Sequence, residues 1–212
     1  YWKYKYRVVF QGNRVVTQNW TAAIFQDLGS QPASLEAGKA CDINGLLPGN
    51  VVEFADADCA YTQADLIGPE TWIAIPKDRW PKEWIQKGYR NLVVIMKKAL
   101  YGHPDSGTAW EKHADKAIVN DCGFQRVPQW PACYWHPDLN VFLSVYVDDF
   151  KLSGPESEVD KAWKHIRNSG REIGPTQKGD DVYLGCMHKH KSFEISCRKY
   201  NVVIYDMEAV SY

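Results

Sequence analysis

Residues 133–149 read CYWHPDLNVFLSVYVDD, and this stretch decides the fold that we expect for the chain. The apolar runs Cys133–Trp135 and Val141–Val147 flank a loop of turn-forming residues, which is a pattern typical of a β-hairpin. Asp148 and Asp149 follow at the end of the second arm. Two carboxylates at the end of an apolar strand are costly to bury without a partner. They either form a solvated turn or point towards a cation.

Strand and helix patterns continue on both sides of this hairpin. From Val51 onward the order is strand, helix, strand pair, helix and strand, which predicts an α+β fold with a ferredoxin-like antiparallel sheet and helices on one face. A basic hairpin is expected before it, with arms at Lys5–Val9 and Arg14–Val16. The other expected strands are 51–56, 72–75, 92–96, 133–135, 141–147, 181–189 and 192–197, and the expected helices are 30–42, 108–122 and 157–169.

Composition and charge place the chain among ordinary globular proteins. It has 212 residues, of which 45% are hydrophobic and 24% charged, and this excludes a disordered or low-complexity chain. No apolar run is long enough for a membrane span, and the six cysteines without a CxxC pair favour a reducing, intracellular compartment. The net charge is only −1, but basic residues cluster in 1–20 and 79–98 while acids gather in 53–65 and 148–160. Such separation suits a protein that binds a polyanion around a cation centre, and it equally suits solvated surface charge.

A third acid, Asp56, also ends an apolar strand, Val51–Asp56. Adjacent strands of one sheet would bring Asp56 beside Asp148 and Asp149. Carboxylates at that spacing repel one another unless divalent cations lie between them, and oxygen ligands suit Mg²⁺ or Mn²⁺. Two such ions can activate an attacking hydroxyl and stabilise a leaving phosphate in an in-line displacement.

Several ordered motifs then carry a family resemblance. Tyr146 to Asp149 form a YVDD box, and Asp56 is followed by an aromatic residue, an acid and a leucine at matching spacing. In this respect the chain resembles the reverse transcriptases of copia-type LTR retrotransposons. The remaining segments similar to that family are 5–12, 71–76, 96–102, 109–110, 123–124 and 183–185.

The resemblance covers nearly the whole chain and implies the fingers and palm of a right-handed polymerase. It assigns 1–50 and 67–105 to a fingers-like subdomain and 51–66 with 106–212 to the palm, without thumb or ribonuclease H regions. The implied reaction is RNA-directed DNA synthesis, in which two Mg²⁺ or Mn²⁺ ions support nucleotidyl transfer from a dNTP to a primer 3′ end. The implied partners are an RNA or DNA template with its primer and the dNTP, with no membrane.

The resemblance also implies roles for individual residues. The catalytic and metal-binding residues are Asp56, Asp148 and Asp149, and the nucleotide-binding residues are Lys5, Arg7, Ala57, Tyr61 and Asp105. Among these, the Ala57 carbonyl would be an extra metal ligand and Tyr61 would exclude a ribose 2′-hydroxyl. Tyr61 can also be read as a core aromatic residue, and Lys5 and Arg7 as an exposed basic strand.

One departure from the family keeps a second function open. The family usually continues as LKQAPRAW after its Leu-Tyr-Gly, whereas this chain has His103-Pro104-Asp105-Ser106-Gly107-Thr108 before Ala109-Trp110. The family's Arg therefore falls on Thr108, and its Gln on Asp105. The alternative is a non-catalytic, domesticated palm-like module that binds nucleic acid or a protein partner. A minor alternative is a zinc site, because Cys186, His188 and His190 share one face of a strand and Cys197 would lie on the paired strand.

Overall fold

The computed structural model describes residues 8–25 and 30–208. The described residues form two compact units, 8–25 with 61–110 and 30–60 with 111–208. These limits differ from the boundaries predicted at 50, 66 and 105. Segment 30–50 belongs to the second unit because its helix α1 (Leu35–Gly45) packs on the sheet of that unit. Within the described ranges, no helix is both long and apolar enough to cross a membrane.

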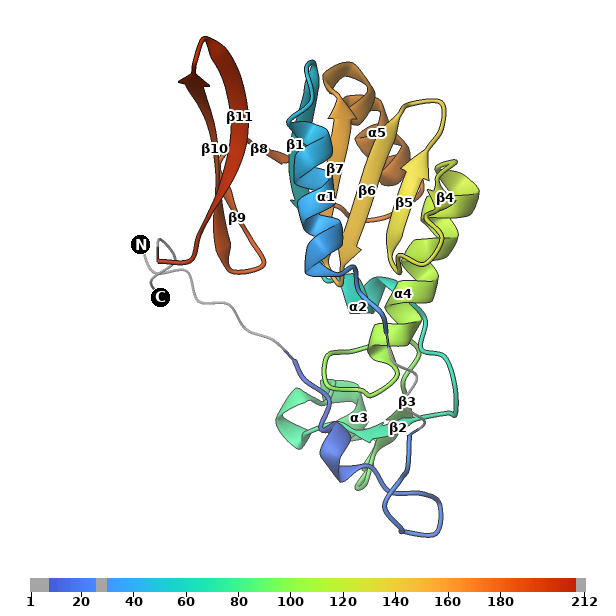
Figure 1. The fold of residues 1–212 in the computed structure, drawn as a ribbon. Helices are drawn as coiled ribbons and strands as arrows, with labels where there is room; N and C mark the ends of the chain where they lie inside the picture. The colour runs from blue at the N-terminus through green and yellow to red at the C-terminus, as the bar shows by residue number, and fades with distance from the viewer. Residues whose placement is uncertain (1–7, 26–29, 209–212) are drawn as a thin grey trace. The chain divides into compact units, whose positions relative to one another are not determined.

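A six-stranded antiparallel sheet forms the centre of the second unit (Figure 1). Its order is β4-β5-β6-β7-β1-β8, so β7 pairs with β6 on one side and with β1 on the other. The predicted hairpin is present as β5 and β6. The strand bounds are β1 Asn50–Asp56, β4 Gln125–Arg126, β5 Cys133–His136, β6 Val141–Tyr146, β7 Asp149–Pro155 and β8 Gln177–Lys178.

Helix α5 (Glu156–Asn168) covers one face of this sheet, as its amphipathic pattern predicts. Its first turn carries acids and its last turn carries His165 and Arg167, which complements the helix dipole. The Trp163 side chain lies beside Glu53, which is opposite Leu152 in the sheet. The buried stripe of α5 consists of Val159, Ala162, Trp163 and Ile166.

Helix α1, which precedes Val51 and was not part of the predicted ferredoxin-like order, covers the opposite face. Its Cys41 thiol and its Asn44 amide contact the Ser153 hydroxyl at 3.2 and 2.9 Å. Ser153 follows Leu152 in β7, and successive strand residues point to opposite faces. Helix α1 begins at Leu35 and not at residue 30, because the Ser34 hydroxyl caps it by accepting a hydrogen bond from the Ala37 N–H at 3.3 Å.

A three-stranded sheet completes the second unit, in the order β11-β10-β9. Its strands are β9 Asp181–Tyr183, β10 Cys186–Ile195 and β11 Arg198–Asp206. The prediction that 181–189 pairs with 192–197 is therefore wrong. The turn lies at Ser196 and Cys197, whose φ angles are 50° and 58°, and neither residue is a common signal for such a turn.

The first unit consists of short elements. The strands expected at 72–75 and 92–96 are present as β2 (Trp72–Ala74) and β3 (Val93–Ile95), and they pair with each other in a two-stranded sheet. The predicted strand Arg14–Val16 is wrong, because a 3-10 helix ends at Arg14 and Val16 forms only an isolated bridge with Ala22. The remaining 3-10 helices are Gly12–Arg14 and Lys77–Arg79. The remaining α-helices are α2 Ala60–Gln63, α3 Lys82–Gln86 and α4 Ser106–Lys116. Helix α4 is followed directly by a π-helix at Ala117–Asp121.

Candidate functional site

Two of the three predicted catalytic carboxylates are direct neighbours. Asp56 ends β1, Asp149 begins β7, and the two residues are opposite each other in the antiparallel ladder. Directly opposite residues project from the same face of a sheet. The pKa of Asp149 is raised to about 7, first by burial, then by the negative charges of Asp148 and Asp56 and by a hydrogen bond with Asp56. The three acids therefore lie close enough to repel one another.

The third carboxylate belongs to the turn between β6 and β7. Val147 and Asp148 form this turn, and Val147 has a φ of 56°. A positive φ at the first turn residue is typical of a type II′ turn, where glycine is the usual residue. A β-branched residue in this conformation costs about 1–3 kcal/mol and persists only where the surroundings enforce it. One such restraint is the Asp148 carbonyl, which accepts a hydrogen bond from the Ala57 N–H at 2.7 Å.

The end of β1 is also fixed from its other side. The Asp56 carbonyl accepts a hydrogen bond from the Gly174 N–H at 2.9 Å, and the Asp58 N–H donates to the Glu172 carbonyl at 2.8 Å. Arg167 of α5 donates to the Gly174 carbonyl at 2.8 Å, so this segment is tied to the helix behind the sheet. The backbone around Asp56 is thus held by the turn on one side and by residues 172–174 on the other.

The donors at this edge fit a hard divalent cation by their chemistry. They are carboxylate oxygens, and their mutual repulsion is what a cation relieves. Among the residues that the structure describes, however, no group of three His, Cys, Asp or Glu side chains is arranged to hold a metal ion. Asp56 and Asp149 are paired in register, while Asp148 is attached to Ala57 through its backbone carbonyl. The Ala57 carbonyl as a ligand stays a prediction.

The predicted nucleotide-binding residues of the first unit have different surroundings. Lys5 and Arg7 lie outside the described residues. The Tyr61 ring is partly buried and packs on the Tyr101 ring at a centroid distance of 4.6 Å. Asp105 is only 4% exposed and directly precedes α4, where its N–H donates to His103 Nδ1 at 3.1 Å. Asp105 is thus buried at the start of the helix, and its contact with a nucleotide stays a prediction.

Comparison with known proteins finds transposon polyproteins of yeast among the proteins similar to this chain. No family model matches the chain. The chain is 23% identical over 106 residues to the truncated transposon Ty1-A Gag-Pol polyprotein of Saccharomyces cerevisiae, which is 50% of this chain and 9% of that protein. The Ty1-DR5 and Ty1-LR2 Gag-Pol polyproteins of the same yeast match with the same identity over 6% of their length. The similarity supports a retrotransposon origin. The chain spans less than a tenth of each of these polyproteins, so their activities are not transferred to it by this match.

The zinc alternative does not agree with the structure. Cys186, His188 and His190 do alternate along β10, but the His188 ring is buried against Asp42 of α1. Cys197 lies in the turn at the far end of the ribbon, since Ile195 pairs with Arg198 and Cys186 pairs with Tyr183. Among the described residues of this ribbon, no three His, Cys, Asp or Glu side chains are grouped so that they could hold a metal ion.

A buried charge cluster, which the sequence did not indicate, lies next to the carboxylates. Lys151 is two residues beyond Asp149 on the same face of β7, and its ammonium lies 2.6 Å from Asp42 Oδ1. The two side chains are 0% and 2% exposed. Lys151 also donates to the Gly38 carbonyl at 3.1 Å and lies over the Tyr183 ring, 4.8 Å from its centroid.

The same Asp42 carboxylate anchors the C-terminal sheet. Tyr205 of β11 donates its hydroxyl hydrogen bond to Asp42 Oδ2 at 2.7 Å, and His188 Nδ1 lies 3.6 Å from that oxygen. Burial acts to raise the pKa of Asp42, but contacts with His188, Lys151 and Tyr205 outweigh it and leave the pKa below its usual value. Asp42 is therefore a buried, charged residue that joins α1 to β7, β10 and β11.

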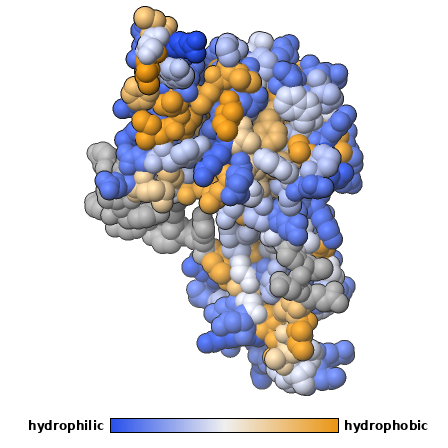
Figure 2. Space-filling view, in the orientation of Figure 1, coloured by the Kyte–Doolittle hydropathy of each residue, from blue (hydrophilic) through white to orange (hydrophobic). Residues whose placement is uncertain are grey.

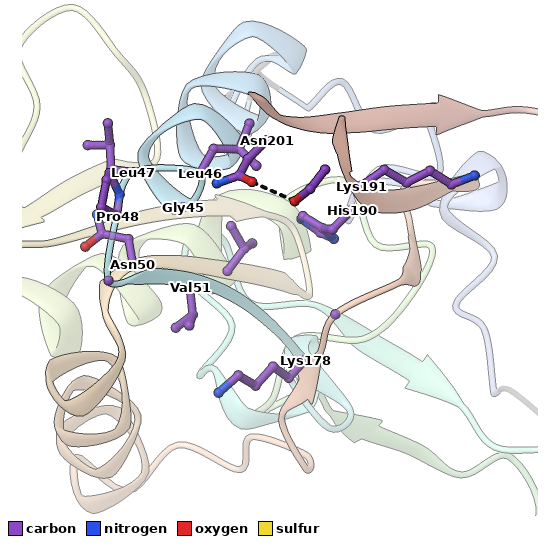
Figure 3. Close-up of a pocket in the computed structure, with 14 residues that line it drawn as sticks. Gly45, Leu46, Leu47, Pro48, Asn50, Val51, Lys178, His190, Lys191 and Asn201 are labelled. Atoms are coloured by element: carbon purple, nitrogen blue, oxygen red, sulfur yellow. Dashed lines mark hydrogen bonds between the residues drawn. The ribbon is translucent and has the colours of Figure 1, made fainter. Parts of the chain in front are cut away.

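A cleft of about 360 Å³ separates the end of α1 and the start of β1 from the middle of β10 and β11 (Figure 3). Lys178, His190 and Asn201 contribute polar groups to it, and the Ser192 hydroxyl hydrogen bonds with Asn201 Oδ1 at 2.7 Å. The predicted catalytic residues do not line this cleft. We therefore regard the edge with Asp56, Asp148 and Asp149 as the candidate site.

Proposed function

We propose that this chain is the fingers and palm region of an RNA-directed DNA polymerase from a copia-type retrotransposon polyprotein. The observation that carries the proposal is the register of Asp56 opposite Asp149, beside the turn that holds Asp148. The ordered motifs along the sequence and the similarity to Ty1 Gag-Pol polyproteins support it independently. In this proposal the antiparallel sheet with α5 behind it is the polymerase palm.

In this proposal the carboxylates of Asp56, Asp148 and Asp149 hold two Mg²⁺ or Mn²⁺ ions. Bound ions of this kind make a primer 3′-hydroxyl a better nucleophile and neutralise the charge that develops on the leaving pyrophosphate. The hydrogen bond between Ala57 and Asp148 keeps the β6–β7 turn against the end of β1. The protein thereby maintains the spacing of its carboxylates before any substrate is bound, which is the preorganisation that phosphoryl transfer needs.

Tyr61 is proposed as the residue that selects deoxynucleotides. Its ring is held by packing on Tyr101, and a ring that is fixed in this way can exclude a 2′-hydroxyl by its bulk alone. The proposed substrates are a dNTP and a primed RNA or DNA template.

A primer-extension assay with an RNA template, a DNA primer and Mg²⁺ tests the proposal. Asp148→Asn should lower extension at least about 1,000-fold, because losing one ligand carboxylate removes several kcal/mol of transition-state stabilisation. Primer–template binding, measured by fluorescence anisotropy, should stay within about twofold, since binding rests mainly on phosphate contacts elsewhere. Asp160→Asn on the exposed side of α5 is the matched control and should change neither quantity. Extension that survives Asp148→Asn would overturn the assignment.

The second candidate function is the non-catalytic module. The buried position of Asp105 and the lack, among the described residues, of a three-ligand metal group favour it. The same assay separates the two functions. A wild-type chain that binds primer–template and extends no primer with either Mg²⁺ or Mn²⁺ would support the module.

A further inference from the structure

Within the described residues, the outer edge of β11 has free hydrogen-bonding capacity that a second strand could use. β11 is the terminal strand in the order β11-β10-β9, and none of the described strands pairs with its other side. The ribbon formed by β10 and β11 continues well past the short strand β9, which pairs only with Cys186 to His188. A long unpaired edge is a ready template for another strand, and a two-stranded ribbon alone is only marginally stable in water.

The turn of the ribbon determines which groups of β11 face outward. Ile195 and Arg198 close the turn as a hydrogen-bonded pair, and hydrogen-bonded pairs alternate along an antiparallel ladder. Arg198 and every second residue after it therefore bond to β10. The N–H and C=O groups that point to the open edge belong to the residues between them, namely Lys199, Asn201, Val203 and Tyr205.

The sequence of β11 is complementary to itself when it is read in the opposite direction. In RKYNVVIYD, two basic residues begin the strand, an acid ends it, and Val202 is at its centre. An antiparallel pair centred on Val202 places Arg198 opposite the partner's Asp206. It places Tyr200 opposite the partner's Ile204, and both pairs occur twice by symmetry.

In the same register, the backbone N–H and C=O groups at the open edge of one β11 lie opposite those of the other β11. Lys199 is opposite the partner's Tyr205, and Asn201 is opposite the partner's Val203, so outward-facing groups meet only outward-facing groups. A shift by one residue breaks this match. A shift by two residues in one direction places Arg198 opposite the partner's Ile204, so the charge pairing is lost. In the other direction Arg198 meets the partner's Glu208, which lies beyond the end of β11.

We propose that β11 is a homodimerisation edge, through which two copies of this chain join their ribbons into one continuous antiparallel sheet about a twofold axis at Val202. Tyr200 and Ile204 are 45% and 38% exposed, and apolar side chains gather over this ribbon at the upper left of Figure 2. Each would gain an apolar cross-strand neighbour on pairing. The inference does not depend on the proposed polymerase activity.

Among the described residues, the ribbon is joined to α1 at its base and not along its middle. Its base is anchored by the hydrogen bond from Tyr205 to Asp42, while the cleft of Figure 3 separates its middle from the end of α1. Asp206 also pairs with Lys189 of the neighbouring strand at 2.6 Å. In the dimer this carboxylate would lie between Lys189 and the partner's Arg198, and a carboxylate has enough acceptor sites for both.

Sedimentation velocity over a concentration series, from about 1 to 200 μM, tests the proposal, since micromolar dissociation constants fall in that range. Val203→Pro removes an N–H that points to the partner and leaves the ladder with β10 intact, because edge strands tolerate proline at such positions. We expect the wild type to dimerise and Val203→Pro to stay monomeric. Val203→Thr keeps the N–H and the β-branched shape, so it is the matched control and should dimerise.

Charge exchange tests the register itself. Arg198→Asp or Asp206→Arg alone sets like charges opposite each other at both ends and should weaken dimerisation about tenfold or more. The double variant R198D/D206R restores opposite charges and should return the dissociation constant to within about threefold of wild type. Lys189→Ala removes only the pair within the chain and should leave the dimer unchanged. A monomer at every concentration, a dimer or aggregate that Val203→Pro does not dissociate, or a double variant without recovery would each overturn the proposal.

Discussion

Replacing Asp42 by Asn should destabilise the second unit more than any surface substitution. Asn has nearly the same shape, so the change removes charge and leaves the packing in place. Lys151 would then be a fully buried ammonium without a counter-charge, since its side chain is 0% exposed. Removing one partner of a buried ion pair costs about 3–5 kcal/mol, which is a large fraction of the stability of a typical domain.

Urea unfolding followed by circular dichroism measures this loss directly. Lys161→Ala is the matched control, because Lys161 pairs with Glu158 on the exposed side of α5 and is itself 55% exposed. We expect a loss of no more than about 0.5 kcal/mol there. The pair D42L/K151M should recover part of the loss, since two apolar side chains need no charge partner, although Tyr205 and His188 still lose their contacts with Asp42.

The pH dependence adds a second test of the same ion pair. The pKa of Asp42 is lowered in the folded chain, so its contribution to stability is present above the unfolded pKa and is lost as the pH falls through the folded value. Asp42→Asn should therefore flatten the acid limb of the stability curve. If Asp42→Asn costs less than about 1 kcal/mol, Lys151 does not depend on Asp42 and the reasoning fails.

Three further predictions concern other parts of the chain. Burial lowers the pKa of His136; the charge of Asp138 opposes this effect and the nearby His165 adds to it. The stability of the fold should therefore fall as the pH drops through about 6.5, because the unfolded histidine takes up a proton there and the folded one does not. Thermal unfolding between pH 8 and 5 should show a smaller loss for His136→Gln, and an equal loss would refute the role of this ring. Tyr61→Ala should admit ribonucleotides in primer extension, whereas Tyr61→Phe should keep the selectivity. Parallel loss of both activities and of stability in Tyr61→Ala would make the ring a packing residue. Ala at both Lys97 and Lys98, which are exposed, should lower the slope of log K against log salt for nucleic-acid binding by about one per lysine. An unchanged slope would leave them as ordinary surface lysines.

The central part of the fold could be predicted from the sequence because its signals are local. The hairpin of residues 133–146 has apolar arms around a turn-rich loop, and α5 shows both its apolar stripe and its charged ends. The adjacency of Asp56 and Asp149 was expected because each follows or ends an apolar strand of one sheet, but the strand that pairs with β1 is β7, which begins at Asp149 and was not among the expected strands. The local sequence determines where these elements begin and end, and only a few arrangements of them bury their apolar faces in one sheet.

The elements that could not be predicted depend on contacts between distant segments. Lys151 alternates with Phe150 and Leu152, so it reads as a solvent-facing strand residue, and only α1 makes its face an interior one. The partner Asp42 is 109 positions away and carries no local signal of its role. The end of β10 was missed for a different reason, because Ser196 and Cys197 adopt positive φ angles without a glycine or asparagine that would have indicated the turn.

The buried ion pair also bears on the charge of the candidate site. Lys151 is on the same face of β7 as Asp149, one pleat away, and a lysine there would be expected to lower the pKa of that acid. The pKa of Asp149 is raised instead, first by burial and then by the charges of Asp148 and Asp56. The ammonium of Lys151 is paired with Asp42 at 2.6 Å, which offsets its charge. The edge with the three acids therefore keeps its surplus of negative charge, and that surplus is what we propose a pair of divalent cations offsets.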